Sequence, residues 1–137
     1  MVFKIFLDAN VCSDFLLQRK GSEPAEKLFK QMMDKEIKVF ITPTILHIII
    51  YYLGKVHEHT VVKTIISNLL IDINIIDCNK EIAINAVNSK FKNIEDALQY
   101  YTAMHHKVDF FVTNDKDLRR QGLPFLPIYS PTEYLNL

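Results

Sequence analysis

The sequence predicts an α/β fold, a three-layer α/β/α sandwich with a mostly parallel central sheet. The first observation is that short apolar runs rich in β-forming residues alternate with longer segments that carry helix signals. The second is that 137 residues suit one domain, 1–137, and contain no repeat, linker or low-complexity tract. Right-handed crossovers between parallel strands would place helices on both faces of the sheet.

The N-terminal half is expected to hold two strands and three helices. Residues 2–7 are a short run of β-forming residues, and apolar residues then recur at helical spacing over 11–16. A second helix is expected over 22–35, because a serine N-cap precedes Pro and acids in its first turn, and residues 38–42 form the next strand. Residues 43–53 are predicted to be helical because of their length, although their many β-branched residues would equally suit a strand.

The C-terminal half continues the alternation. Asn79, Asn93 and Ser130 each stand where an N-cap is expected. In order, the expected elements are a helix over 60–70, a strand over 71–77, helices over 79–89 and 94–105, a strand over 109–113, a turn or helix over 116–121, a strand over 126–129 and a terminal turn from 130.

Composition excludes several classes of protein. Sixteen Lys and Arg balance sixteen Asp and Glu, so a nucleic-acid partner would have to meet a local basic patch. Cys12 and Cys78 are too few for a disulfide framework and are interpreted as small buried hydrophobes in a reducing cytoplasm. No signal peptide is recognised, and the most apolar segment, 41–53, is too short to span a membrane. No P-loop motif occurs.

Acidic residues gather where the expected strands end. Asp8 ends the first strand, Asp115 and Asp117 follow the strand over 109–113, and Asp96 lies in the first turn of the preceding helix. The carboxyl ends of parallel strands form the functional crevice of such folds, so these acids are expected to meet there. Clustered carboxylates repel and need a cation, and oxygen ligands without His or Cys favour Mg²⁺ or Mn²⁺. Metal-activated water attacking a phosphodiester is therefore the leading chemistry.

Each acid also has an ordinary structural interpretation. Asp8 could be a turn former or helix N-cap, and Asp96 a first-turn acid that is favoured by the helix dipole. Asp115 could be a turn residue, and Asp117 could form a surface ion pair. The hypothesis of a metal site depends on all of them meeting at one sheet edge.

Three segments of the chain resemble a known family. The segments Leu7-Asp-Ala-Asn-Val-Cys-Ser-Asp-Phe-Leu16, Asn93-Ile-Glu-Asp-Ala-Leu-Gln-Tyr-Tyr101 and Asp109-Phe-Phe-Val-Thr-Asn-Asp-Lys-Asp-Leu118 look like the acidic motifs of PIN domains, in order. The resemblance extends over essentially the whole chain and includes the VapC-type toxin ribonucleases.

The resemblance implies a cytoplasmic, Mg²⁺- or Mn²⁺-dependent endoribonuclease, which could be the toxin of a toxin–antitoxin pair. By that match Asp8, Asp96 and Asp115 would be the catalytic, metal-binding acids, with Asp117 as an additional metal ligand. The implied partners are RNA, an antitoxin that inserts a basic side chain among the acids, and a second copy of the chain in a homodimer.

One position departs from the family pattern. Ile48 stands where PIN domains usually carry a further acid, in the helix after the second strand. His47 is adjacent but need not face the site, because successive helix residues point about 100° apart. Asn10 and Asp14 are closer to Asp8 and are the expected supporting residues, although they could be a helix cap and a solvated acid. The alternative function is a catalytically degraded PIN-like module that binds RNA or protein.

The sequence also leaves open the hypothesis of a phosphotransferase of the haloacid dehalogenase type. Asn10 argues against it, because that enzyme class needs a second Asp at this position.

Basic and aromatic residues are the candidates for substrate contact. The expected phosphate-binding residues are Lys116, Arg119 and Arg120. Further charge could come from Lys4, Arg19 and Lys20. The tyrosines that could stack on unpaired bases, if exposed, are Tyr51, Tyr52, Tyr100 and Tyr101. The apolar segment 45–53, together with Phe15 and Leu16, exceeds what a small core needs and suggests a dimer interface.

Overall fold

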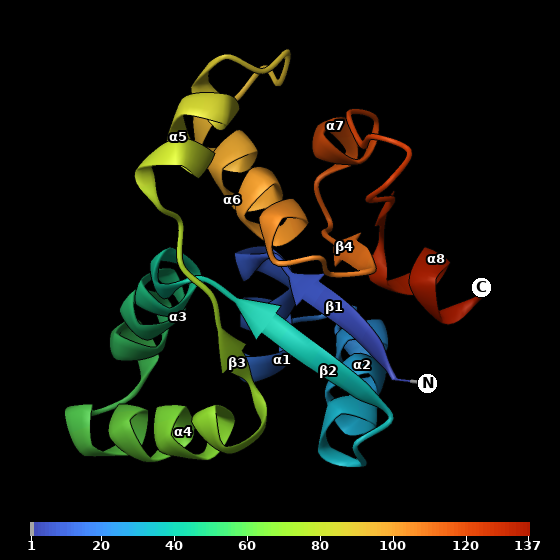
Figure 1. Cartoon of the computed structure of the whole chain (residues 1–137). Helices are drawn as coiled ribbons and strands as arrows, with labels where there is room; N and C mark the ends of the chain where they lie inside the picture. Colours follow the sequence, from blue (N-terminus) through green and yellow to red (C-terminus); the bar gives the residue numbers. More distant parts are fainter. Residues whose placement is uncertain (1) are drawn as a thin grey trace.

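A computed structural model describes residues 2–137 and shows, within that range, five strands and eight helices (Figure 1). Their bounds are β1 (Phe3–Leu7), α1 (Ala9–Leu16), α2 (Glu23–Met33), β2 (Ile37–Ile41), α3 (Pro43–Val56), α4 (His59–Asp72), β3 (Asn74–Ile75), α5 (Lys80–Val87), α6 (Ile94–His105), β4 (Phe110–Val112), α7 (Lys116–Arg119), β5 (Ile128–Tyr129) and α8 (Pro131–Leu135).

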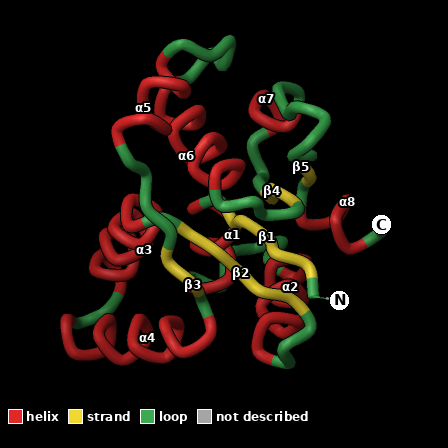
Figure 2. The backbone as a smooth tube through the Cα atoms, in the orientation of Figure 1, coloured by secondary structure: helices red, strands yellow, loops and turns green. Residues whose placement is uncertain are grey.

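The strands form one parallel sheet in the order β3-β2-β1-β4-β5. The chain builds outward from β1 to β2 and β3 on one side, then returns to place β4 and β5 on the other side (Figure 2). The strand order therefore reverses between β1 and β4. In open α/β sheets the ligand crevice lies beyond the carboxyl ends of the strands at this kind of point.

Helices cover both faces of the sheet, as the predicted sandwich requires. On one side α1 packs against α2 and α3, and α2 packs against α8; Figure 1 shows α1 and α2 behind the sheet. On the other side α5 and α6 pack against each other, and the Tyr100 ring of α6 lies 5.7 Å from the Phe111 ring of β4. Phe6 and Phe111 stack with their ring centroids 4.8 Å apart on that same face.

The buried tyrosine of α6 also holds the loop that precedes β5. The Tyr100 hydroxyl donates a hydrogen bond to the carbonyl of Leu126 at 2.7 Å and accepts one from the N–H of Leu123 at 2.8 Å. Because both polar capacities of the hydroxyl are used, the ring is buried without an unsatisfied group. Tyr100 is thus a core residue and is unavailable for stacking on a base.

The structure confirms the predicted alternation and corrects one strand. Residues 43–53 are helical, because Thr42 caps α3 by accepting a hydrogen bond from the N–H of Ile45 at 3.2 Å. The strand expected over 71–77 is mostly wrong: α4 runs to Asp72, and the N–H of Ile73 still donates to the carbonyl of Leu69 at 3.1 Å. Only Asn74–Ile75 pairs with β2, at the edge of the sheet.

The two cysteines differ in their surroundings. Cys12 is buried as predicted, and burial raises the pKa of its thiol. Cys78 is exposed, so the interpretation of it as a buried hydrophobe is wrong. It lies in the segment between β3 and α5, which passes over the surface. Among the helices of residues 2–137, none combines the length and apolar character that crossing a bilayer requires.

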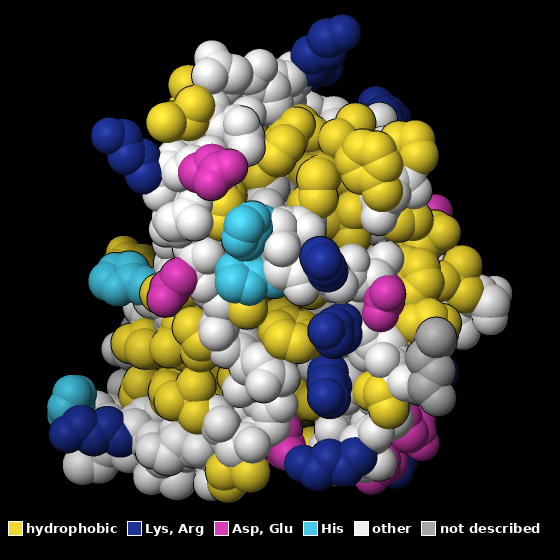
Figure 3. All heavy atoms as spheres, viewed as in Figure 1, with side chains coloured by type: hydrophobic (Ala, Val, Ile, Leu, Met, Phe, Trp, Pro, Cys, Tyr) yellow, Lys and Arg dark blue, Asp and Glu magenta, His cyan; other side chains and the backbone are white. Residues whose placement is uncertain are grey.

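The face towards the viewer in Figure 1 leaves part of the sheet uncovered. Lys4 of β1 and Lys38 of β2 are register partners and both exposed, and Figure 3 shows basic side chains in a row over these strands. Lys4 stands near the start of β1, away from the carboxyl end where the acids lie. It therefore adds no charge to the candidate site.

Candidate active site

Three acids reach the carboxyl edge of the sheet from three different elements. Asp8 follows β1 and is the N-cap of α1, where its Oδ1 accepts a hydrogen bond from the N–H of Ala9 at 2.8 Å. Asp115 follows β4 and is the N-cap of α7, where its Oδ1 accepts from the N–H groups of Asp117 and Leu118 at 2.9 and 3.2 Å. Asp96 lies in the first turn of α6, which Asn93 caps.

Asp8 and Asp115 do cap helices, but capping does not use all the hydrogen-bonding capacity of their carboxylates. A carboxylate has two oxygens and several lone pairs, and the cap uses only Oδ1 of Asp8 and of Asp115. No donor contacts the carboxylate of Asp96 among the hydrogen bonds and ion pairs of residues 2–137. Capping positions these groups and leaves oxygens free for a ligand.

A pocket of about 290 Å³ joins the three acids. Its walls are formed by Asp8, Ala9, Asn10, Ser13, Arg19, Ile48, Tyr52, Asp96 and Asp115. A second hollow of about 360 Å³ shares Asp8, Ile48 and Asp96 with it and adds Glu95 and Gln99. The structure therefore brings Asp8, Asp96 and Asp115 together in one water-accessible acidic pocket.

The negative charges of the acids in this pocket repel one another. Burial, and after it the nearby charges of Asp8, Asp115 and Glu95 in that order, together raise the pKa of Asp96 to about 6. Burial also raises the pKa of Asp8, against the lowering effect of hydrogen bonds from Thr113 and Ala9, while the charge of Asp115 adds to the rise. No ion pair within residues 2–137 neutralises any of the three. Ionised, the site is an uncompensated negative cluster that favours a cation.

Thr113, the buried residue after β4, forms hydrogen bonds to both Asp8 and Asp115. It was not among the site residues predicted from the sequence. Its hydroxyl donates to Asp8 Oδ2 at 2.8 Å and accepts from Asn10 Nδ2 at 3.2 Å and from the N–H of Asp115 at 3.1 Å. One donor and two acceptors are all that a hydroxyl has, so its bonding is complete. Thr113 thereby fixes the orientation of Asp8 relative to Asp115. Its only signal in the sequence is a hydroxyl at the end of an apolar strand.

Ser13 is a second residue that sequence reasoning missed. It is buried on α1, lines the acidic pocket, and its Oγ lacks a hydrogen-bond partner among residues 2–137. An unsatisfied buried hydroxyl carries an energetic cost of about 1–3 kcal/mol. Ser13 therefore places a buried polar group without a partner in the wall of the acidic pocket.

The donor set fits a hydrated hard cation. No three His, Cys, Asp or Glu side chains of residues 2–137 come close enough to enclose a bare ion. Mg²⁺, however, usually keeps several waters and is held by only one or two carboxylates. Asp8, Asp96 and Asp115 supply such a set. No donor contacts the Asp96 carboxylate, the cap leaves one Asp115 oxygen unused, and both Asp8 oxygens keep further lone pairs beside the bonds from Ala9 and Thr113.

The other predicted acids lie at or beyond the margin of the pocket. Asp117 is exposed and pairs with Arg120 at 3.6 Å, outside the pocket walls. Asp14 pairs with Arg19 at 3.3 Å and accepts from Asn114 Nδ2 at 2.8 Å, also outside them. Asn10 does line the pocket, inside α1 rather than at its cap, and its Oδ1 accepts from the N–H of Asn114 at 3.1 Å.

The basic residues expected to hold phosphates are placed differently from the prediction. Lys116 and Arg120 are exposed, and neither lines the pocket. Arg119 donates to the carbonyls of Thr113 and Asn114 at 3.5 and 3.2 Å, so it braces the turn that carries Asp115. The cation that does line the pocket is Arg19.

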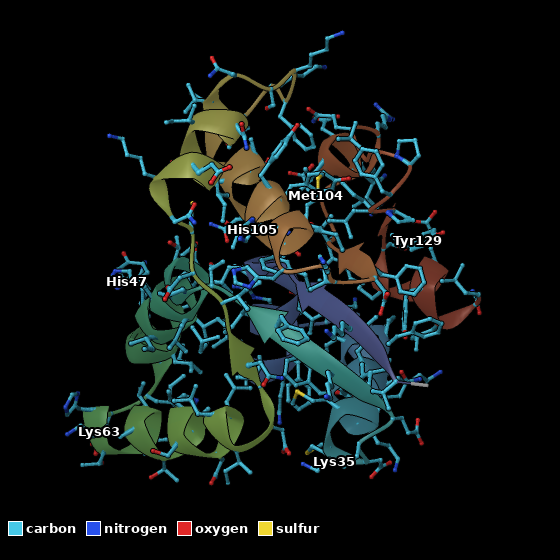
Figure 4. The ribbon with its side chains drawn as sticks, in the orientation of Figure 1. Lys35, His47, Lys63, Met104, His105 and Tyr129 are labelled. Atoms are coloured by element: carbon cyan, nitrogen blue, oxygen red, sulfur yellow. The ribbon has the colours of Figure 1, made fainter. Side chains whose placement is uncertain are left out.

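Ile48 faces the site, and His47 does not. Ile48 lines both hollows beside Asp8 and Asp96, so its position on α3 is directed at the acids. Figure 4 shows His47 pointing away from the sheet on the outer side of α3, where it is exposed. Gln99, in the second hollow, is held by the hydroxyl of Thr42 at 2.6 Å.

Three solved structures of complexes share this architecture. Structures described as VapBC2 from Rickettsia felis bound to a DNA fragment from their promoter, a toxin–antitoxin complex from Klebsiella pneumoniae, and FitAcB from Neisseria gonorrhoeae align with TM-scores of 0.69, 0.67 and 0.63. Identities are 17%, 20% and 15%, and the alignments cover 92%, 93% and 93% of this chain and 97%, 97% and 98% of those chains. At these identities the matches establish the fold.

The comparison with curated proteins finds no significant match. The PIN domain family matches residues 4–117, a range that includes all three acids and the strands that carry them. The chain belongs to the PIN domain family.

Proposed function

We propose that this protein is a metal-dependent endoribonuclease and the toxin of a toxin–antitoxin pair. The observation that carries the proposal is the convergence of Asp8, Asp96 and Asp115, from three elements, on one pocket in which no ion pair of residues 2–137 neutralises them. Membership of the PIN family and the fold shared with toxin–antitoxin complexes support it.

In this proposal the three acids hold Mg²⁺ or Mn²⁺, and the bound ion supplies an activated water and charge stabilisation at a scissile phosphodiester. The residues of the chain have separate tasks. The Thr113 hydroxyl donates a hydrogen bond to Asp8 Oδ2 and would hold this carboxylate in position for the ion. Arg119 keeps the Asp115 turn in place. Asp117 is the candidate for a further ligand, through the exposed side of α7.

The test is cleavage of an unpaired oligoribonucleotide with Mn²⁺ or with EDTA. We expect Asp8→Ala and Asp96→Ala to lose activity by at least about 100-fold, because each removes a charge from the metal site. Asp77→Ala is the matched control, since Asp77 is exposed and lies outside the pocket. Metal-dependent cleavage that persists in both pocket variants would refute the assignment.

A second function, a degraded PIN module that binds RNA or protein without cleaving, is favoured by one observation. Ile48 faces the pocket with an apolar side chain that cannot bind a metal or its water. Mn²⁺ binding by the Ile48→Glu variant and by the wild type distinguishes the degraded module from the nuclease. A wild type that binds no Mn²⁺, together with a variant that does, supports the degraded module, whereas wild-type binding supports the nuclease.

A protein partner has a surface of its own on this chain. A hollow of about 660 Å³ between α1, α2, the end of α3 and the middle of α4 is lined by apolar side chains that include Phe15, Leu16 and Ile65. We assign this hollow to an antitoxin or, in a homodimer, to a second copy of the chain. Light scattering of the purified chain, alone and after co-expression with the neighbouring gene product, distinguishes the two.

A further inference from the structure

Arg19 and three residues of α3 form a strip of cations and aromatic rings that leads away from the acidic pocket. The guanidinium of Arg19 lies 5.5 Å from the ring centroid of Tyr52, and both residues line the pocket. The Tyr52 and Tyr51 rings meet edge to face at 5.5 Å, and Lys55 Nζ lies 4.6 Å from the Tyr51 centroid and 5.9 Å from the Tyr52 centroid. We call these four residues the Arg19–Lys55 strip.

The strip is accessible. Tyr51 is 57% exposed and Tyr52 40% exposed, although apolar rings of this size are usually more buried in a monomeric domain. Both cations are also exposed, and among residues 2–137 the ion pair of Arg19 is with Asp14 and not with any of the three pocket acids. Arg19 thus places a half-exposed guanidinium at the wall of the acidic pocket.

We propose that the Arg19–Lys55 strip binds unpaired nucleotides of a single-stranded RNA next to the cleaved bond, an inference that rests on the proposed nuclease function. Cations interleaved with exposed rings are the chemistry of single-strand binding, in which phosphates meet the charges and bases stack on the rings. Two rings offer two stacking positions. The stretch of α3 from Ile48 to Lys55 extends about 10 Å, enough for about two or three stacked nucleotides.

The geometry also gives an order to the nucleotides along the strip. Arg19 and Tyr52 border the pocket, whereas Tyr51 and Lys55 lie farther along the strip. The nucleotide nearest the scissile phosphate meets Arg19 and Tyr52, and the next one meets Tyr51 and Lys55. Duplex RNA cannot use the rings, because its bases are already stacked in the helix.

The experiment is fluorescence anisotropy of a labelled unpaired oligoribonucleotide of about twelve nucleotides, in EDTA and at low salt so that no cleavage occurs. We expect Tyr52→Ala and Tyr51→Ala each to weaken binding by about tenfold, and Tyr52→Phe to retain affinity because it keeps the ring. Arg19→Gln is expected to weaken binding and to reduce its salt dependence. The same sequence closed into a hairpin should bind no better to the wild type than to the Tyr variants.

Matched controls lie away from the strip. Phe125→Ala removes another exposed ring, which is 71% accessible, and Lys63→Gln removes a cation that points outward from α4 in Figure 4. Both should bind RNA as the wild type does. Because the tested side chains are exposed, circular dichroism should show every variant folded.

The outcomes separate this inference from the proposed function. Equal RNA affinity in the wild type and in the Tyr51 and Tyr52 variants, while the wild type still cleaves with Mn²⁺, overturns the strip alone. Tyr-dependent RNA binding by a wild type that never cleaves overturns the nuclease and leaves a binding strip. A Tyr51→Ala variant that changes from dimer to monomer with unchanged RNA affinity overturns the strip in favour of contact between two copies.

Discussion

Replacing Asp96 with Asn should stabilise the metal-free protein at neutral pH. The pKa of Asp96 is raised from 3.8 to about 6 by burial and by the charges of Asp8, Asp115 and Glu95. Between these values the native state binds more protons than the unfolded state, so stability falls as pH rises, and above about pH 6 the full cost of the ionised group is present. Asn removes this cost and keeps the shape of the side chain.

The magnitude follows from the size of the pKa change. A rise from 3.8 to about 6 corresponds to at most about 3 kcal/mol. Because Asp96 is only half-buried, solvent screening reduces the expected gain to about 1 kcal/mol, or roughly 3–5 °C in Tm. The N-cap of α6 is unaffected, since it uses the Asn93 side chain and the Asp96 backbone.

The assay is thermal and urea unfolding followed by circular dichroism in EDTA, at about pH 7.5 and about pH 3.5. The gain should appear at the higher pH and nearly vanish at the lower, where Asp96 is protonated in the native state and mostly protonated in the unfolded state. Asp77→Asn, on an exposed loop, is the control and should change stability by less than about 0.5 kcal/mol. An Asp96→Asn variant that is less stable at neutral pH, or equally stabilised at both pH values, would refute the electrostatic account of the pocket.

Three further predictions concern the residues around the acids. Thr113→Val removes the donor to Asp8 and should cost about 1–3 kcal/mol in urea unfolding and weaken Mn²⁺ binding, while Thr113→Ser keeps both; equal effects of the two would contradict the role of the hydroxyl. Mn²⁺ affinity by calorimetry should fall as pH drops through about 6, by about tenfold per pH unit at lower pH, because protonated Asp96 cannot bind the ion; a flat profile from about pH 7 to 5 would contradict this. Arg119→Gln should lower Tm through lost contacts to the turn that carries Asp115 and leave the salt dependence of RNA binding unchanged; a reduced salt dependence would return Arg119 to the phosphate-binding role that the sequence predicted.

Most of the helices and strands could be predicted from residues close together in the sequence. Asn79 and Asn93 cap α5 and α6 as expected, and Ser130 forms a capping box with Glu133, because capping depends on residues only a few positions apart. The strand expected over 71–77 failed because an apolar run has the same composition at a helix end and in an edge strand. Only pairing with β2 decides where α4 stops, and the sequence does not show that pairing.

The candidate site was predictable to the extent that topology determines it. Asp8 and Asp115 end neighbouring parallel strands, and Asp96 begins the helix between them in sequence, so their convergence follows from the strand order. Ser13 was harder to foresee, because it enters the pocket from α1, which packs against α3. Arg19 was named in the sequence analysis only as a source of further charge, and it lines the pocket from the turn after α1. Arg119 misled the prediction, since nothing in its spacing shows that backbone carbonyls occupy it.

The most direct test of the central claim is calorimetric titration of the metal-free protein with Mn²⁺, repeated on Asp8→Ala. If Asp8, Asp96 and Asp115 form a metal site, the wild type binds Mn²⁺ saturably at neutral pH and Asp8→Ala loses that binding while remaining folded. A wild type that binds no Mn²⁺ at millimolar concentration, or a variant that binds it as well as the wild type, would contradict the claim.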